Sequence, residues 1–167
     1  MGTKRLWLLL GAGLLAAGAT ARGQEHGKAE QHVSRQAMIH QRGSLVMPFD
    51  LDKTVHVFKR TKEGGVQQVR AKDPDDREQI RLIRQHLRDE AQRFARGDFG
   101  DPATLHGHDM PGLQVLERSA GALEVSYKDL SDGAEIAYKA RDPEVLGAIH
   151  QWFGAQLHDH GADATDK

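Results

Sequence analysis

The sequence contains no cysteine, and this absence limits both how the fold is stabilised and which chemistry the protein can perform. Without disulfide bonds, side-chain packing must hold the chain together. A cysteine nucleophile is excluded, and a transition-metal site would have to use histidine, methionine and carboxylate side chains. Neither a Gly-x-Ser-x-Gly motif nor a phosphate-binding glycine loop occurs, so we expect no catalytic residue.

The chain also lacks a surplus of positive charge. It has 23 Lys and Arg residues against 24 Asp and Glu residues, which gives a formal net charge of −1. Nucleic-acid-binding proteins normally carry a concentrated basic surface. We therefore expect no nucleic-acid partner.

The segment 1–21 has the pattern of a secretory signal peptide. Lys4 and Arg5 precede an apolar run over 6–17, and Ala19-Thr20-Ala21 has the small-x-small pattern of a cleavage site. The apolar run is too short and wrongly flanked for a transmembrane helix, so we expect no stable membrane anchor. The prediction is a periplasmic or secreted protein after cleavage near Ala21.

The remaining residues are enough for one domain with a hydrophobic core. We expect a polar N-terminal segment with a short helix over 22–45, a single α+β domain over 46–160 and a polar tail over 161–167. Strand patterns occupy 54–59, 66–72, 123–127 and 134–138. One helix is expected over about 75–96, with its buried face formed by Ile80, Ile83, Leu87, Ala91 and Phe94. A last helix should begin at Asp142-Pro143.

Two parts of the domain, 53–97 and 122–160, repeat the same order of strand, turn, strand and helix. One constant shift places Phe58 on Tyr127 and Gly64 on Gly133, and a slightly smaller shift aligns the two helices. Neither unit can bury its apolar face alone. We therefore expect a two-layer α+β sandwich, in which pseudo-repeated β-β-α units form a four-stranded antiparallel sheet packed by two main helices.

Ten histidines are the compositional outlier of the sequence. His56 aligns with Val125 in the repeat, so it should point toward the helix layer. His86 lies beside the apolar face of its helix, and His150 lies on the flank of the last helix. A histidine in such a layer needs partners for its ring nitrogens, and the alternative to a ligand role is a structural histidine. The four histidines near the chain ends are expected to be exposed to solvent: His26, His32, His158 and His160.

Potential ligand atoms crowd the segment from His106 to Gly112. Two imidazoles flank Gly107, and the Met110 thioether follows two residues later. Histidine and methionine without a thiolate favour copper, with zinc as the second choice. Asp109 is a further candidate, as a ligand or as the acceptor that orients an imidazole. The predicted ligands are His56, His86, His106, His108, Met110 and His150, and the alternative for the segment is a polar surface loop.

Several segments resemble those of a group of small exported bacterial proteins of unknown function. The segments are Met47–Asp50, Thr54–Phe58, Ile83–Leu87 and His106–Leu113, and the resemblance covers most of the chain after the signal peptide. It implies that His56, His86, His106, Asp109 and Met110 are landmarks of the group. Some members carry the label aspartate carbamoyltransferase. That activity is not expected here, because the Ser-Thr-Arg-Thr and His-Pro-Thr-Gln motifs of those enzymes are absent.

The leading functional prediction is a periplasmic or secreted protein that binds or delivers a metal ion, most simply copper. The first alternative is a non-enzymatic module that binds another exported protein or a small ligand and uses its histidines structurally. A weaker alternative is a small hydrolase built from His56, His86 and Asp109.

Overall fold

The computed structural model describes residue 31 and residues 35–167. The expected signal peptide, His26 and His32 lie outside the described residues. Within the described part of the chain, no helix combines the length and apolar character needed to cross a membrane.

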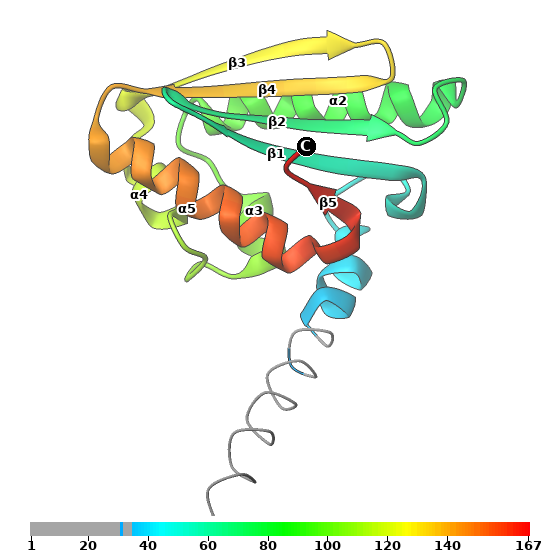
Figure 1. Cartoon of the computed structure of the whole chain (residues 1–167), viewed down its shortest axis with the longest axis horizontal. Helices are drawn as coiled ribbons and strands as arrows, with labels where there is room; N and C mark the ends of the chain where they lie inside the picture. Colours follow the sequence, from blue (N-terminus) through cyan, green and yellow to red (C-terminus); the bar gives the residue numbers. More distant parts are fainter. Residues whose placement is uncertain (1–30, 32–34) are drawn as a thin grey trace, which may run out of the picture.

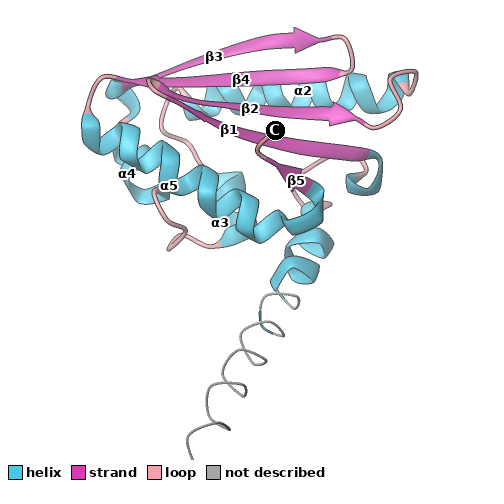
Figure 2. Ribbon diagram, in the orientation of Figure 1, coloured by secondary structure: helices cyan, strands magenta, loops and turns pink. Residues whose placement is uncertain are grey.

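Five strands form one mixed sheet in the order β3-β4-β2-β1-β5 (Figures 1 and 2). The strands are β1 (Thr54–Thr61), β2 (Gly64–Ala71), β3 (Leu123–Leu130), β4 (Gly133–Ala140) and β5 (Ala164–Thr165). The first four pair antiparallel, whereas β5 pairs parallel with β1. The prediction of a four-stranded antiparallel sheet is therefore corrected to a five-stranded mixed sheet. The C-terminal tail, which was expected to be only a polar segment, adds the fifth strand through backbone pairing with His56 and Val57.

Two long helices carry most of the second layer. They are α2 (Arg77–Phe94) and α5 (Pro143–His160), and each begins at an aspartate whose side chain accepts hydrogen bonds from backbone N–H groups of the first turn. All five residues of the expected buried face of α2 are buried. Shorter helical segments cover 35–43, α3 (Gly100–His106) and α4 (Leu113–Arg118), with single 3₁₀ turns at Leu51–Lys53, Ala120–Ala122 and Gly161–Asp163.

Both long helices pack on the same face of the sheet. The ring of Tyr138, on β4, lies 6.2 Å from Phe94 of α2 and 5.5 Å from Trp152 of α5. On β1, Phe58 contacts Phe153 of α5 with ring centres 5.4 Å apart. The apolar core therefore fills the space between one sheet and one layer of helices, and the α+β class is confirmed.

The two expected β-β-α units differ in their surroundings. The strands β1 and β3 begin at Thr54 and Leu123, and β2 and β4 begin at Gly64 and Gly133, so both pairs have the same separation in sequence. The helices begin slightly closer together, at Arg77 and Pro143. However, α3 and α4 are inserted between the units and β5 follows only the second one, so the repeat does not describe the whole fold.

Candidate functional site: a histidine pocket

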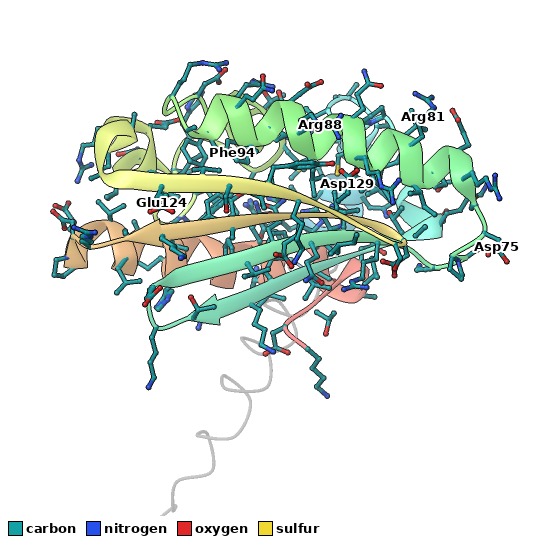
Figure 3. All side chains as sticks on the ribbon, turned by 90° about the horizontal axis from the view of Figure 1, so that it is seen from above. Asp75, Arg81, Arg88, Phe94, Glu124 and Asp129 are labelled. Atoms are coloured by element: carbon teal, nitrogen blue, oxygen red, sulfur yellow. The ribbon has the colours of Figure 1, made fainter. Side chains whose placement is uncertain are left out.

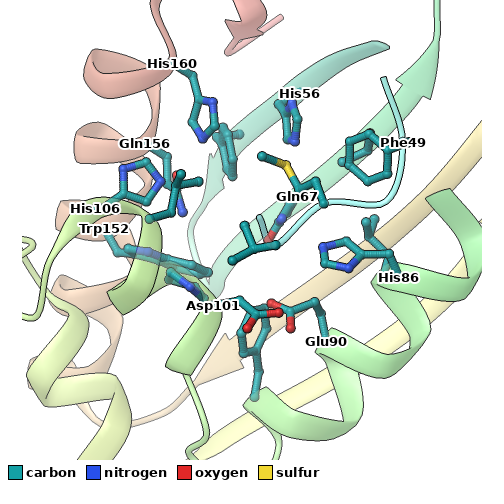
Figure 4. Close-up of a pocket in the computed structure, with 18 residues that line it drawn as sticks. Phe49, His56, Gln67, His86, Glu90, Asp101, His106, Trp152, Gln156 and His160 are labelled. Atoms are coloured by element: carbon teal, nitrogen blue, oxygen red, sulfur yellow. The ribbon is translucent and has the colours of Figure 1, made fainter. Parts of the chain in front are cut away.

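A cavity of about 50 Å³ lies where β1, β2, α2, α3, α5 and the segment 46–49 meet (Figure 4). It is lined by four histidines and is called the histidine pocket here: His56, His86, His106 and His160. In Figure 4, His56, His106 and His160 gather on one side, whereas His86, Glu90 and Asp101 lie on the other. So many polar side chains around one cavity are unusual in a protein core, because each buried polar atom needs a hydrogen-bond partner.

Each histidine reaches the pocket from a different element. His56 is buried because alternate β1 residues, Thr54, His56 and Phe58, face the helix layer. His86 lies on α2, His106 is the last residue of α3, and His160 is the last residue of α5. Only the packing of these elements brings the four imidazoles together.

The ring of His160 is central to this group. Its centre lies 5.0 Å from that of His56 and 5.1 Å from that of His106. Phe49 contacts both His56 and His86, with ring centres 5.9 Å and 5.6 Å away. Among residues 31 and 35–167, no group of three or more His, Asp or Glu side chains is arranged to hold a metal ion.

His106 is fixed by a buried aspartate. Its Nδ1 lies 2.9 Å from Oδ2 of Asp159, and the Arg35 guanidinium donates to both carboxylate oxygens at 2.6 and 2.7 Å. Burial alone would raise the pKa of Asp159, but the hydrogen bonds from His106, Arg35 and His158 together lower it far below its usual value. Because the carboxylate can only accept, Nδ1 of His106 must carry a proton, which makes Nε2 the ring nitrogen that can serve as a metal ligand.

His56, His86 and His160 are held in the neutral form by burial. Burial, reinforced by His86, lowers the pKa of His56 to about 4. Burial also lowers the pKa of His160 well below its usual value, and that of His86 to a smaller extent. Neutral imidazole is the form that binds metal ions.

Three buried polar atoms have no hydrogen-bond partner in the described part of the chain. They are Nδ1 of His56, Nε1 of Trp152 and Oε1 of Gln156. All three residues line the histidine pocket. Buried polar atoms left in this way generally indicate bound water, an ion or a ligand.

Carboxyl groups form the far side of the pocket. Glu90 is buried, and burial together with Asp101 raises its pKa to about 8. Arg93 donates to Glu90 at 3.1 Å and to Asp101 at 2.7 Å, which partly offsets this rise. Beside them, Gln67 accepts a hydrogen bond of 2.7 Å from the Tyr138 hydroxyl.

The structure brings together His56, His86 and His106 of the predicted ligand set and leaves out the others. The His108 side chain is 81% exposed, and Asp109 is also exposed. Met110 is buried but does not line the pocket. Nε2 of His150 lies 2.9 Å from the Gly64 carbonyl oxygen at the β1–β2 turn.

Sequence reasoning missed part of the pocket. The expectation of an exposed His160 is wrong, because the residue is only 6% exposed. Its position could have been found from α5, on which Trp152, Gln156 and His160 follow at intervals of four and therefore share one face. Met47, which also lines the pocket, gave no signal of its own.

Comparison of the chain with protein-family models, with curated proteins and with solved structures gives no significant match. The resemblance to small exported bacterial proteins therefore stays a prediction. The function has to be argued from the histidine pocket itself.

Proposed function

We propose that this protein binds one transition-metal ion in the histidine pocket, copper in preference to zinc. His56, His106 and His160 are the proposed imidazole ligands, and the role is binding or delivery in the periplasm or outside the cell. The observation that carries the proposal is the cluster of three neighbouring imidazoles around a cavity with unpartnered buried polar atoms, His56 Nδ1 among them.

The size of the cavity favours an ion. Pockets for organic ligands usually measure roughly 300–1,000 Å³. A cavity of about 50 Å³ is far smaller and suits an ion with one or two water molecules. A larger ligand would need the core around the pocket to open.

The spacing of the rings also supports an ion. With metal–nitrogen distances of about 2 Å and tetrahedral angles, two imidazoles bound to one ion have ring centres roughly 5 Å apart. The spacings in the protein are 5.0 and 5.1 Å. The ring nitrogens do not yet converge, so binding requires the imidazoles to rotate within the cavity.

The donor set favours copper over zinc. It combines neutral imidazoles with the thioether of Met47, which lines the same cavity, and contains no thiolate. Thioether is a soft ligand that suits copper(I), whereas structural zinc sites usually include thiolates. His86, whose ring lies 5.6 Å from that of Phe49 on the other side of the pocket, is the remaining imidazole that can complete the set.

The test is the metal content of the chain purified without a histidine tag and dialysed against copper(I), copper(II) or zinc. We expect one copper ion per chain, and its loss in the His56→Ala, His106→Ala and His160→Ala variants. His108→Ala is the matched control, because its side chain is 81% exposed, lies two residues from His106 and does not line the pocket. Circular dichroism establishes that each variant is folded. Low occupancy that survives all three pocket substitutions would contradict the proposal.

A second measurement does not depend on the variants. An ion that binds only the folded state raises the midpoint of thermal unfolding, by an amount that grows with the logarithm of the free ion concentration. We expect this dependence for copper and a smaller one for zinc. An unchanged midpoint at saturating copper would argue against the site.

One observation favours the alternative of structural histidines in an exported interaction module. Nδ1 of His106 is already satisfied by Asp159, and water molecules in the cavity are able to satisfy the unpartnered atoms. In that case the pocket substitutions destabilise the chain without any change in metal content. The hydrolase alternative has less support, because Asp109 does not line the pocket.

A further inference from the structure

The strand β3 forms one edge of the sheet along its full length of eight residues. It pairs with β4 on one side, and no strand of the described residues pairs with its other side. Figure 3 shows β3 in the foreground beside α2, with Glu124 near one end and Asp129 near the other. An edge strand of this kind presents unpaired N–H and C=O groups, which can pair with another chain.

The side chains of β3 divide into two rows. Glu124, Ser126 and Lys128 are exposed on the face away from the helices, whereas Val125 and Tyr127 are half-buried on the helix side. On this face, opposite charges face each other across β3 and β4, since Glu124 is opposite Lys139 and Lys128 is opposite Glu135. The second of these is an ion pair of 3.2 Å.

We propose that two copies of this chain pair through β3, antiparallel, about a two-fold axis at Ser126. In this register Glu124 of each copy lies opposite Lys128 of the other. The symmetry makes this contact twice, and opposite charges facing each other across strands stabilise a sheet. The row of side chains then alternates in charge across the junction: Glu135 and Lys128 of one copy, followed by Glu124 and Lys139 of the second copy.

The helix-side row fits the same register. Val125 of each copy lies opposite Tyr127 of the other, so these half-buried side chains meet at the junction, where the Arg88 guanidinium already lies over the Tyr127 ring, 5.0 Å from its centre. An aromatic residue facing a β-branched residue is a favourable cross-strand pair.

The neighbouring symmetric registers are unfavourable. Centring the axis on Glu124 or on Lys128 places two like charges directly opposite each other, which is destabilising. Centring it on Val125 places Ser126 opposite Glu124, and centring it on Tyr127 places Ser126 opposite Lys128. In both registers neither Glu124–Lys128 contact forms. The charges that normally protect an edge strand from association therefore select one register of self-association here.

The test uses sedimentation equilibrium of the purified chain at low ionic strength. We expect a monomer–dimer equilibrium whose dissociation constant rises about tenfold or more in Glu124→Lys and in Lys128→Glu, since each substitution places two like-charged pairs at the junction. Lys59→Glu makes the same charge change as Lys128→Glu at an exposed position on β1 and is its matched control. It should leave the dissociation constant within about threefold of the wild-type value, a change below that of a lost contact.

Mixing the two variants separates the interface from effects on folding. One variant carries lysine at both positions and the other carries glutamate at both, so an equimolar mixture restores both contacts in a heterodimer. Lys128→Glu also loses the intrachain ion pair with Glu135, and Glu124→Lys places a lysine opposite Lys139; mixing cannot repair either change. Recovery of near wild-type dimerisation in the mixture supports the proposal.

Two outcomes overturn the proposal. A wild-type chain that stays monomeric throughout the concentration range excludes self-pairing and leaves the edge to a strand from a different protein. A wild-type dimer that both substitutions leave intact places the interface elsewhere on the molecule.

Discussion

Glu90 gives the most direct test of the electrostatics of the histidine pocket. Its side chain is 7% exposed, and burial raises its pKa to about 8 from the ordinary value of 4.5. The folded chain therefore binds one proton more than the unfolded chain between these two values. The stability that depends on this proton is complete below about pH 4.5 and is lost as the pH rises through about 8.

The size of the effect follows from the width of this range. Each pH unit inside it lowers the free energy of unfolding by about 1.4 kcal/mol, so the loss between pH 5 and pH 7 is about 3 kcal/mol. Domains of this size are stable by roughly 5–15 kcal/mol, which makes the loss easy to measure. Glu90→Gln removes the titrating group but keeps an oxygen that can accept from Arg93.

The assay is urea unfolding of the wild type and Glu90→Gln at several pH values from 5 to 8, with a metal chelator present. We expect the free energy of unfolding of the variant, relative to that of the wild type, to rise by about 1.4 kcal/mol for each pH unit over this range. Asp98→Asn is a suitable control, since Asp98 also pairs with Arg93 but lies near the surface, where its pKa is lowered instead of raised. A difference between Glu90→Gln and wild type that does not vary with pH would refute the reasoning.

Three further predictions concern the surroundings of the pocket. His56 should remain neutral at pH 5 in a nitrogen-15 NMR titration, because burial lowers its pKa to about 4, and the stability that its neutral form contributes should fall as the pH drops from about 6.5 toward 4, opposite in sign to the contribution of Glu90; a ring that titrates near pH 6.5 contradicts its burial. Gly112→Ala should cost more than about 2 kcal/mol in urea unfolding, because φ is +83° and a Cβ would lie 2.2 Å from the Ala148 carbonyl oxygen, whereas Gly147→Ala in open space on α5 should stabilise by up to about 1 kcal/mol; equal effects of the two substitutions would be inconsistent with this account. Arg35→Met should cost about 1–3 kcal/mol, because it removes two charged hydrogen bonds from the buried Asp159; an unchanged unfolding midpoint would show that the pair contributes nothing.

The elements that the sequence predicted well are those specified by residues close together in the chain. The alternation around His56 and Phe58, and the glycines at the β1–β2 turn, were sufficient for the first hairpin. The face of α2 followed from apolar residues at helical spacing, and the expected start at about residue 75 lies two residues before the observed one at Arg77. These patterns depend on residues close together in the chain, so they predict the elements without knowledge of the tertiary structure.

The residues of the histidine pocket could be predicted only in part, for the same reason. His56, His86 and His106 could be proposed because they lie at marked positions in their own segments. Their proximity could not be derived, because it depends on how α3 and the end of α5 pack against β1. The His108 and Met110 side chains illustrate the opposite error, since closeness in sequence to His106 did not bring them to the same site.

The sequence by itself determined the α+β class, the order of strands and long helices, and the need for any metal site to rely on histidine and methionine. Only the tertiary structure decided that Ala164–Thr165 joins the sheet, that His160 turns inward, and that Asp159 and Arg35 fix His106. A two-residue strand has no pattern of its own, and the burial of a histidine is a property of the segments packed around it. Local conformation is encoded in adjacent residues, whereas a site made from five separate elements exists only once the chain has folded.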